Sequence, residues 1–229
     1  MKTKSLALLL AVLLLLTACG SPPTLSPQTT ASPTNAHGDR VEHLHGRTVI
    51  FPEELPAIID YNDNYVTVKS MDAYELEVNF EHTLYIVATI DYSALSESEL
   101  HWFVEEDLTI SAYATHEKNG YDFKRLNLLG KLYDSGTDTL WIVFTSSFFD
   151  TNRYDFGGAE VVLSVDVKQE SGASDGETNS GESIGLHYSK TLQDNLPSAN
   201  TIKAPLIDWI EKWLGEYGEF IGSLASLHK

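Results

Sequence analysis

Residues 84–90 read Leu-Tyr-Ile-Val-Ala-Thr-Ile, and this stretch decides the fold class of the 229-residue chain. Leu84 and Ile86 alternate with Tyr85 and Val87, so that successive side chains face opposite ways. Such a period of two is the pattern of a β-strand, whereas an amphipathic helix repeats its apolar positions every three or four residues. We therefore expect a strand at residues 84–90.

The same alternation recurs on both sides of this stretch. It is found at residues 74–81, 108–115, 140–145 and 161–168, and more briefly at 65–69 and 184–190. Turn-forming residues separate these segments, at Asp60 to Asn64, Asn119-Gly120, Asp134 to Gly136 and Gly157-Gly158. Seven or more short strands with frequent turns predict an all-β fold, an antiparallel β-sandwich. We find no helical segment before residue 195, which argues against a parallel α/β sheet.

The first 20 residues have the features of a secretory signal. Two lysines precede an apolar run of eleven residues, Leu6 to Leu16, which is shorter than the about 20 residues of a transmembrane helix. The run ends in Leu16-Thr17-Ala18-Cys19, which resembles the lipobox of bacterial lipoproteins. The resemblance implies that residues 1–18 are removed as a signal peptide and that Cys19 becomes an acylated N-terminus. The alternative is an ordinary secretory signal with an incidental cysteine.

Acylation also gives the chain's single cysteine a role. An unpaired thiol outside the cell is a liability, and one cysteine cannot form an intrachain disulfide. Two or more acyl chains hold a protein stably on a membrane, where one chain alone is marginal. We therefore expect a lipid-anchored protein on the extracellular face of the cell membrane of a bacterium, of the Gram-positive type.

Composition divides the rest of the chain. Residues 19–46 are expected to be a tether, because Gly20 to Gly38 holds four of the eight prolines and shows no apolar periodicity. Residues 47–192 should form the sandwich. Within it, residues 169–185 are acidic and rich in Gly and Ser, which indicates a mobile hairpin loop or, alternatively, a linker to the C-terminus.

A second resemblance covers about Tyr65 to Lys168. The residues that carry it are Asn64 to Lys69, the strand Leu84 to Ile90, the turn Gly130 to Thr137 and the strand Leu140 to Phe144. This layout resembles the immunoglobulin-like domain of many Gram-positive surface lipoproteins. The resemblance implies an immunoglobulin-like β-sandwich and transfers no catalytic residue. The insertion at residues 169–185 departs from the family's pattern and leaves the register of the last strand open.

The C-terminal residues 193–229 are expected to form an amphipathic helix. Pro205 suits a first helical position, and apolar residues follow at steps of three and four from Leu206 to Leu224. This apolar face has three possible partners: the sandwich, a protein partner or second copy, and the membrane interface. The residues that would contact a partner are Trp209, Trp213, Tyr217 and Phe220.

Two histidines are a candidate metal site. His43 and His45 lie two residues apart, which on a strand places both imidazoles on one face. The sequence supplies no convincing further ligand. The Asx-rich stretch Asp60 to Asn64 is expected to be a turn rather than a calcium loop, because Gly and Glu are missing from the sixth and twelfth positions.

Acidic residues give the clearest surface signal. The chain has a formal charge of −18, which argues against nucleic acid as a partner. Between Glu53 and Asp107, fourteen acidic side chains stand against Lys69 alone, a local charge of −13. Glu75, Glu77 and Glu81 are expected to line one face of a strand. They form either a solvated face or a surface for a cationic partner.

These observations together favour a binding role. The chain has no Gly-x-Ser-x-Gly elbow and no Gly-rich phosphate loop, and its only cysteine is expected to be acylated. We therefore predict no enzyme and no cofactor. The sequence favours a lipid-anchored extracellular module for binding or envelope assembly. The alternative is a ligand-binding lipoprotein that captures a cation or a small solute through its acidic surface.

Overall fold

Two β-sheets build the fold in the part of the chain that the structure, a computed structural model, describes: residues 33–44, 46–117, 121–146, 154–169, 183–202, 206 and 208. The strands are β1 (Arg40–Leu44), β2 (Arg47–Phe51), β3 (Ala57–Tyr61), β4 (Asn64–Val78), β5 (Glu81–Asp91), β6 (Leu108–His116), β7 (Tyr121–Arg125), β8 (Asn127–Asp134), β9 (Thr139–Thr145), β10 (Glu160–Lys168) and β11 (Ser183–Thr191). The all-β, two-sheet architecture predicted from the sequence is thereby confirmed.

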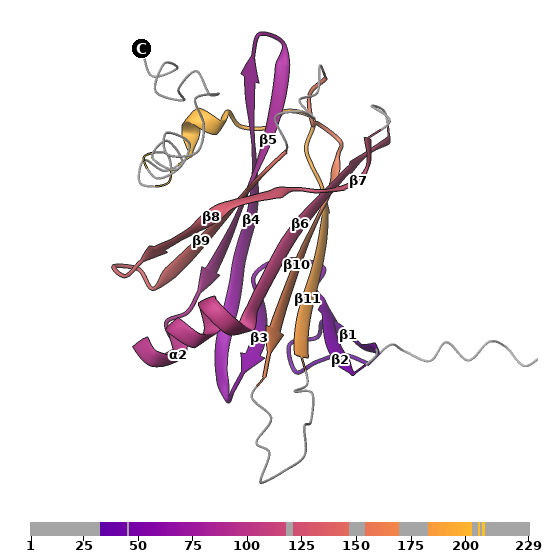
Figure 1. Cartoon of the computed structure of the whole chain (residues 1–229). Helices are drawn as coiled ribbons and strands as arrows, with labels where there is room; N and C mark the ends of the chain where they lie inside the picture. The colour runs from indigo at the N-terminus through magenta and orange to yellow at the C-terminus, as the bar shows by residue number, and fades with distance from the viewer. Residues whose placement is uncertain are drawn as a thin grey trace, which may run out of the picture. The chain divides into compact units, whose positions relative to one another are not determined.

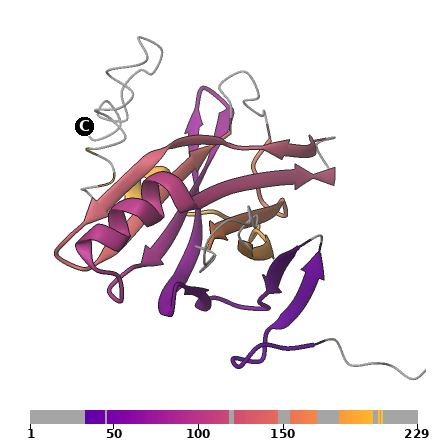
Figure 2. The same ribbon diagram turned by 60° about the horizontal axis from the view of Figure 1, so that its bottom comes forward.

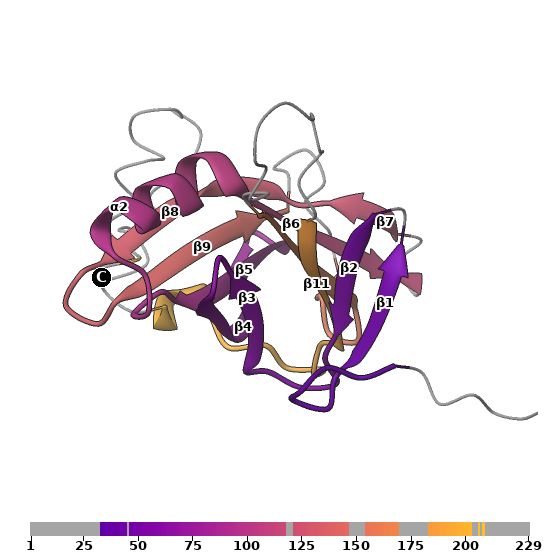
Figure 3. The ribbon, with the colours of Figure 1, turned by 90° about the horizontal axis from the view of Figure 1, so that it is seen from below.

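The sheets face each other across a shared core. One has the strand order β1-β2-β11-β10-β6-β7 and the other the order β3-β4-β5-β9-β8, and Figures 1 and 3 show the two groups of strands. Their inward side chains form one buried cluster, in which Ile86, Phe144 and Leu163 are at most 1% exposed. Burial of these alternating apolar side chains is the main contribution that favours this arrangement of strands.

One strand pair departs from the predicted antiparallel pattern. β2 and β11 run parallel, with Arg47 opposite Ser183 and Leu186 opposite Ile50, whereas the other described pairs are antiparallel. A parallel pair needs a long connection, and β2 and β11 are far apart in the sequence. The hairpin of β1 and β2 is therefore attached to the sheet at the edge of β11 (Figure 2).

The folded region begins earlier than the sequence indicated. The predicted tether extends to residue 46, but Arg40–Leu44 forms β1, and Thr34 makes an isolated bridge to Arg40. The composition of the short strand β1 is mostly polar, so it gives little periodic signal, and its pairing with β2 determines its structure. The predicted boundary therefore falls inside a hairpin. Residues 1–32 lie outside the described residues.

A short helix interrupts the expected run of strands. α2 (Glu97–Trp102) and the π-helical turn η2 (Phe103–Asp107) lie between β5 and β6, where we expected no helix. Ser96 and Glu99 form a reciprocal capping box that starts α2. Phe103 and Val104 are almost fully buried against the shared core. A helix of six residues is too short to show the helical periodicity that a sequence can reveal.

The described residues include no helix with the length and apolarity that crossing a membrane requires.

The last strand settles the question that the acidic insertion left open. β10 and β11 form an antiparallel pair from Glu160 opposite Thr191 to Lys168 opposite Ser183. The preferred reading, in which β11 pairs back after a long hairpin connection, is confirmed. Residues 170–182 of that connection lie outside the described residues.

A second apolar cluster lies on the outer face of the five-stranded sheet. It contains Tyr85, Val143 and Trp141 from the strands, together with Ile202 and Leu206 from the segment after β11. The backbone amide of Glu75 donates to the carbonyl of Pro197, and the 3-10 turn η5 (Ala199–Thr201) follows. The chain therefore returns to cover this face. Residues 193–202 of the predicted C-terminal helix are not α-helical and contain only the turn η5. Leu206 and Asp208 are helical, and residues 203–205, 207 and 209–229 lie outside the described residues.

Candidate functional site

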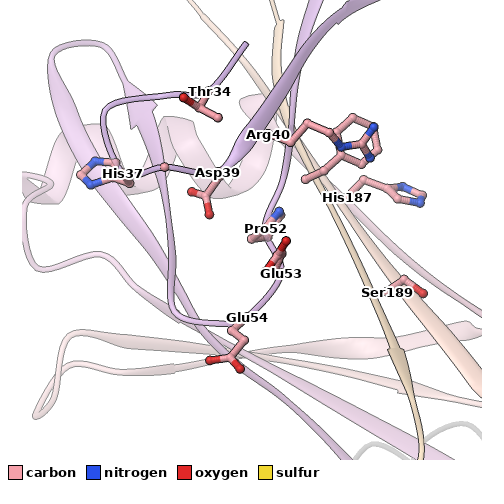
Figure 4. A pocket seen from close by; sticks show the side chains of 11 residues that line it. Thr34, His37, Asp39, Arg40, Pro52, Glu53, Glu54, His187 and Ser189 are labelled. Atoms are coloured by element: carbon pink, nitrogen blue, oxygen red, sulfur yellow. The ribbon is translucent and has the colours of Figure 1, made fainter. Parts of the chain in front are cut away.

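The candidate site is a pocket of about 850 Å³ at the edge of the six-stranded sheet. Three segments that are distant in the sequence line it. They are the loop before β1 and the first residue of β1 (Thr34, His37, Gly38, Asp39 and Arg40), the residues at the end of β2 and after it (Phe51, Pro52, Glu53 and Glu54), and His187 and Ser189 of β11 (Figure 4). The volume is in the range of small-molecule sites in proteins.

A stack of three side chains forms one wall of this pocket. The guanidinium carbon of Arg40 lies 4.1 Å from the centroid of the Phe51 ring, an attractive cation–π contact. His187 belongs to β11, the strand on the other side of β2. The centroid of its ring lies 5.6 Å from that of Phe51, and the two ring planes make an angle of 56°. Arg40 also forms an ion pair with Glu42. The wall is therefore aromatic and carries N–H donors that are held in place.

The opposite wall is a loop that Asn35 organises. Its Oδ1 accepts hydrogen bonds of 2.9 Å from the backbone amides of both His37 and Asp39, and its Nδ2 donates to the Asp39 carboxylate over 3.1 Å. This is the Asx-turn chemistry that fixes a short loop without regular structure. Gly38 has a φ of +89°, a value that favours glycine. The loop thus presents His37 and Asp39 to the pocket in a defined geometry (Figure 4).

Charges of both signs meet in the pocket. Asp39, Glu53 and Glu54 bring carboxylates, while Arg40 and His187 bring nitrogen donors. Burial raises the pKa of the adjacent Tyr188 phenol, and the negative charge of Glu54 adds to this effect. Such a lining suits a ligand with many hydrogen-bonding groups better than a ligand with one strong charge.

A second groove of about 440 Å³ adjoins the stack on the outer face of the same sheet. Its lining includes Phe51, His187 and the ion pair between Arg47 and Asp166. This pair joins β2 to β10 across Gly185 of the strand between them. A Cβ atom on Gly185 would lie 2.7 Å from the Asp166 carboxylate, so glycine leaves room for the ion pair.

The predicted metal ligands are brought together only in part. The Nδ1 atom of His43 lies 3.1 Å from the hydroxyl of Thr48 on the paired strand, and His45 lies outside the described residues. Among the residues that the structure describes, no three His, Cys, Asp or Glu side chains gather closely enough to hold a metal ion. Within the described part of the chain, the fold brings no further ligand to His43.

The prediction that Glu75, Glu77 and Glu81 share one face is wrong. Asn79 and Phe80 have φ values of 53° and 66° and form a two-residue turn that ends β4, so Glu81 belongs to β5. There it pairs with Val78, on the face opposite Glu77 and its partner His82.

Glu75 also has an internal role. Its side chain is only 15% exposed, accepts a hydrogen bond of 2.8 Å from the Phe156 amide and lies 3.4 Å from the Nδ1 atom of His82. Glu77 and Glu81 are exposed. The three carboxylates therefore do not form one surface for a cationic partner.

The other predicted site residues lie outside the described part of the chain. These are Cys19, the expected lipidation site, and Trp209, Trp213, Tyr217 and Phe220 of the expected partner helix.

Comparison with known proteins returned no match, since no family model, curated protein or solved structure resembles the chain closely enough.

Sequence reasoning missed the pocket because its walls meet only through strand pairing. Arg40 lies opposite Phe51 in the β1–β2 register, and His187 follows Leu186, which pairs with Ile50. One signal was available in the sequence. Arg40 and Arg47 are two of only four arginines in the chain, and each is the first residue of a strand of the β1–β2 hairpin.

Proposed function

We propose that this protein is a lipid-anchored, non-enzymatic binding module on the extracellular face of a bacterial cell membrane. Cys19 carries the acyl chains, the residues between Cys19 and the first described residues act as the tether, and the two-sheet body holds a ligand or partner of the cell envelope. The observation that carries the binding role is the pocket of about 850 Å³ between the Asn35 loop and β11, with its fixed aromatic and polar walls. Preformed pockets of this kind favour recognition because little ordering entropy is lost on binding.

The sequence supports the anchor. The lipobox-like residues Leu16 to Cys19 follow an apolar run of signal-peptide length. A net charge of −18 disfavours attachment to anionic lipid through the protein surface, so acyl chains are the more effective attachment. The extracellular environment is oxidising, and the chain has no second cysteine that could form an unwanted disulfide there.

We further propose that the sandwich is of the immunoglobulin-like type. Two features support this. The chain crosses between the sheets four times, from β2 to β3, from β5 to β6, from β7 to β8 and from β9 to β10. After β6 and β7 in the six-stranded sheet it returns to the five-stranded sheet, where β9 pairs with β5. Such crossing connections are typical of Greek-key sandwiches. In this proposal the β1–β2 hairpin is an addition at the edge.

Detergent-phase partitioning tests the anchor. The wild-type protein and the Cys19→Ala variant are expressed in a Gram-positive host that is fed an alkyne-labelled fatty acid. We expect wild type to enter the detergent phase with the label on its N-terminal peptide, and Cys19→Ala to remain unlabelled. Equal partitioning of both proteins, with no acyl mass on the mature N-terminus, would overturn the proposal.

The binding role has a separate test. Wild-type protein and a Phe51→Ala variant, both acylated, are used to capture envelope material from the same host. Material retained by wild type and lost with Phe51→Ala supports binding at the pocket, while a matched Phe80→Ala variant controls for loss of an exposed ring elsewhere. Identical captured material for all three proteins would contradict a binding role for this pocket.

A further inference from the structure

The outer face of the six-stranded sheet gathers most of the chain's arginines. Arg40, Arg47 and Arg125 are three of the four arginines in the chain, and they project from β1, β2 and β7. The contacts of Arg40 with Phe51 and of Arg47 with Asp166 place both on the outer side, away from the shared core. Arg125 lies opposite Tyr113 in the β6–β7 register and so shares that side. In a chain of net charge −18, three arginines on one face of one sheet are an unusual concentration of positive side chains.

Two of these arginines are already paired with carboxylates. Arg40 pairs with Glu42 and Arg47 with Asp166, so neither pair carries net charge. The side chains of both arginines remain 47% exposed, and each guanidinium has more N–H donors than its partner uses. The face therefore offers donors and acceptors in fixed positions while presenting little charge.

Aromatic rings lie at both ends of this face: Phe51 and Tyr113 are partly exposed, and Phe123 is exposed. Phe51 stands at the pocket, between Arg40 and His187. Tyr113 and Phe123 stack in nearly parallel planes, with centroids 5.0 Å apart and an angle of 13°, and Phe123 is 56% exposed. Phe51 is on β2 and Tyr113 on β6, three strand positions apart, which corresponds to a separation of roughly 15 Å across the sheet.

Hydroxyl groups occupy the space between the two ring positions. Ser164 of β10 pairs with Ser111 of β6 on one side and with His187 of β11 on the other, all on the outer face. Ser189 follows on the same side and lines the pocket. Hydroxyls both donate and accept hydrogen bonds, so they match a ligand whose own groups do the same.

From these observations we propose that the outer face of the six-stranded sheet, from Phe51 to Phe123, binds an uncharged polysaccharide. Sugar rings have apolar C–H faces with a slight positive charge, which pack on the negative faces of aromatic rings, and a rim of hydroxyls that hydrogen-bond to fixed polar groups. One sugar packs on Phe51 and a later one in the chain on Phe123. The serines between the two rings hold the intervening hydroxyls, and the two paired arginines hold hydroxyls beside Phe51. This inference deepens the proposed binding role and rests on it.

The charge of the chain selects an uncharged glycan over an acidic one. The Arg47 and Arg40 guanidinium groups are neutralised by their own carboxylates, and Glu53 and Glu54 add negative charge at one end of the face. An acidic polymer would meet these groups and the field of a −18 chain. Repulsion by these carboxylates would keep its binding weak at low salt.

An array of glycans tests this proposal with the full-length acylated protein. A polyoxyethylene detergent keeps the protein in solution and carries no sugar headgroup that could compete. We expect binding to at least one class of uncharged polysaccharide, with an affinity that changes little as salt is raised from about 0.05 to 0.5 M. Binding to acidic glycans alone, or to no uncharged glycan, would overturn the proposal.

Variants then locate the binding surface. Phe51→Ala and Phe123→Ala should each weaken binding to the selected glycan about tenfold, because each removes one ring contact. Phe80→Ala removes a ring that is 81% exposed in the β4–β5 turn and should bind like wild type. Equal affinity of all variants would overturn the assigned face. The array and the capture experiment can disagree. If the protein binds no uncharged glycan on the array, but wild type captures envelope material and Phe51→Ala does not, the proposed binding role stands and only the ligand class is wrong.

Discussion

The carboxylate of Glu75 accepts a hydrogen bond of 2.8 Å from the backbone amide of Phe156, and this contact joins the two sheets. Glu75 belongs to β4 of the five-stranded sheet, and Phe156 leads into β10 of the six-stranded sheet. Phe156 is fully buried in the shared core, and the carbonyl of the next residue, Gly157, lies 3.0 Å from Nε2 of the buried His116. Both sheets therefore hold the segment that closes this end of the sandwich.

Replacing Glu75 should destabilise the fold because it removes the side-chain acceptor of the buried Phe156 amide. We expect Glu75→Ala to lower the free energy of unfolding by about 1–3 kcal/mol, and Glu75→Gln to lower it less, because the amide oxygen can still accept from Phe156. Urea denaturation measures both values. Glu77→Ala, on the same strand but exposed, is the matched control and should change stability by less than about 0.5 kcal/mol. Equal effects of Glu75→Ala and Glu77→Ala would contradict the structural role of Glu75.

The segment after β11 should contribute to stability by covering the five-stranded sheet. Ile202 is 5% exposed and packs in the outer cluster with Trp141 and Val143. The substitution Ile202→Ala should therefore lower the free energy of unfolding by about 2–4 kcal/mol, as truncation of other buried aliphatic side chains does. The control is Gln193→Ala in the exposed part of the same segment. A urea midpoint for Ile202→Ala that equals the control would show that this segment does not protect the sheet.

Stability should fall at alkaline pH because of buried tyrosine phenols. Burial raises the pKa of Tyr85 from 10.0 to about 12, against the lowering effect of its hydrogen bond with Thr145. The unfolded chain therefore loses the phenol proton first, and the stabilisation, complete below pH 10, is lost as the pH rises through about 12. A shift of two pKa units corresponds to on the order of 2–3 kcal/mol of folding stability.

Unfolding free energies measured between pH 9 and pH 12 check this expectation, in a window set by the pKa of Tyr85. Tyr85→Phe cannot titrate, so its stability should fall less steeply than that of wild type over this interval. Burial, with smaller contributions from Glu105 and Tyr92, also raises the pKa of Tyr133 to about 12, but that side chain is 42% exposed and contributes less. Tyr65→Phe, at an exposed position, should follow wild type. Parallel curves for wild type and Tyr85→Phe would rule out this source of pH dependence.

Divalent cations should not stabilise the protein through the acidic surface. Glu75 is engaged by Phe156, and Glu81 faces away from Glu77, so the three carboxylates cannot converge on one ion. We expect no rise in melting temperature at millimolar Ca²⁺ or Zn²⁺, because a ligand that binds only the folded state raises stability by mass action. A Ca²⁺-dependent rise that Glu77→Gln abolishes would restore the cation-capture hypothesis. A Zn²⁺-dependent rise that His43→Ala abolishes would restore the histidine site.

The central strands were predictable because their burial is periodic. Residues 84–90 and 140–145 carry a further signal, since both alternating sets in these runs are apolar except for Thr89 and Thr145. The structure explains this pattern, because β5 and β9 are buried on both faces, by the shared core and by the outer cluster. A strand with few polar positions indicates two covered faces.

Features formed by long-range pairing could not be predicted in the same way. β1 is short and mostly polar, and only its partner β2 fixes it. The change of face at Glu81 depends on a turn at Asn79-Phe80, where only the asparagine favours the positive φ values. The pocket requires Arg40, Phe51 and His187 to meet through two strand registers. No local pattern contains that information.

The pairing of β2 with β11 has a consequence for how the chain acquires its structure. The residue at position 47 finds its partner at position 183, so the six-stranded sheet cannot be completed until nearly the whole polypeptide is available. Such non-local topologies assemble slowly, since loop closure precedes the contacts that compensate for it. Under the proposed export with the N-terminus leading, the proposed ligand-binding face would form only after the last strand had crossed the membrane.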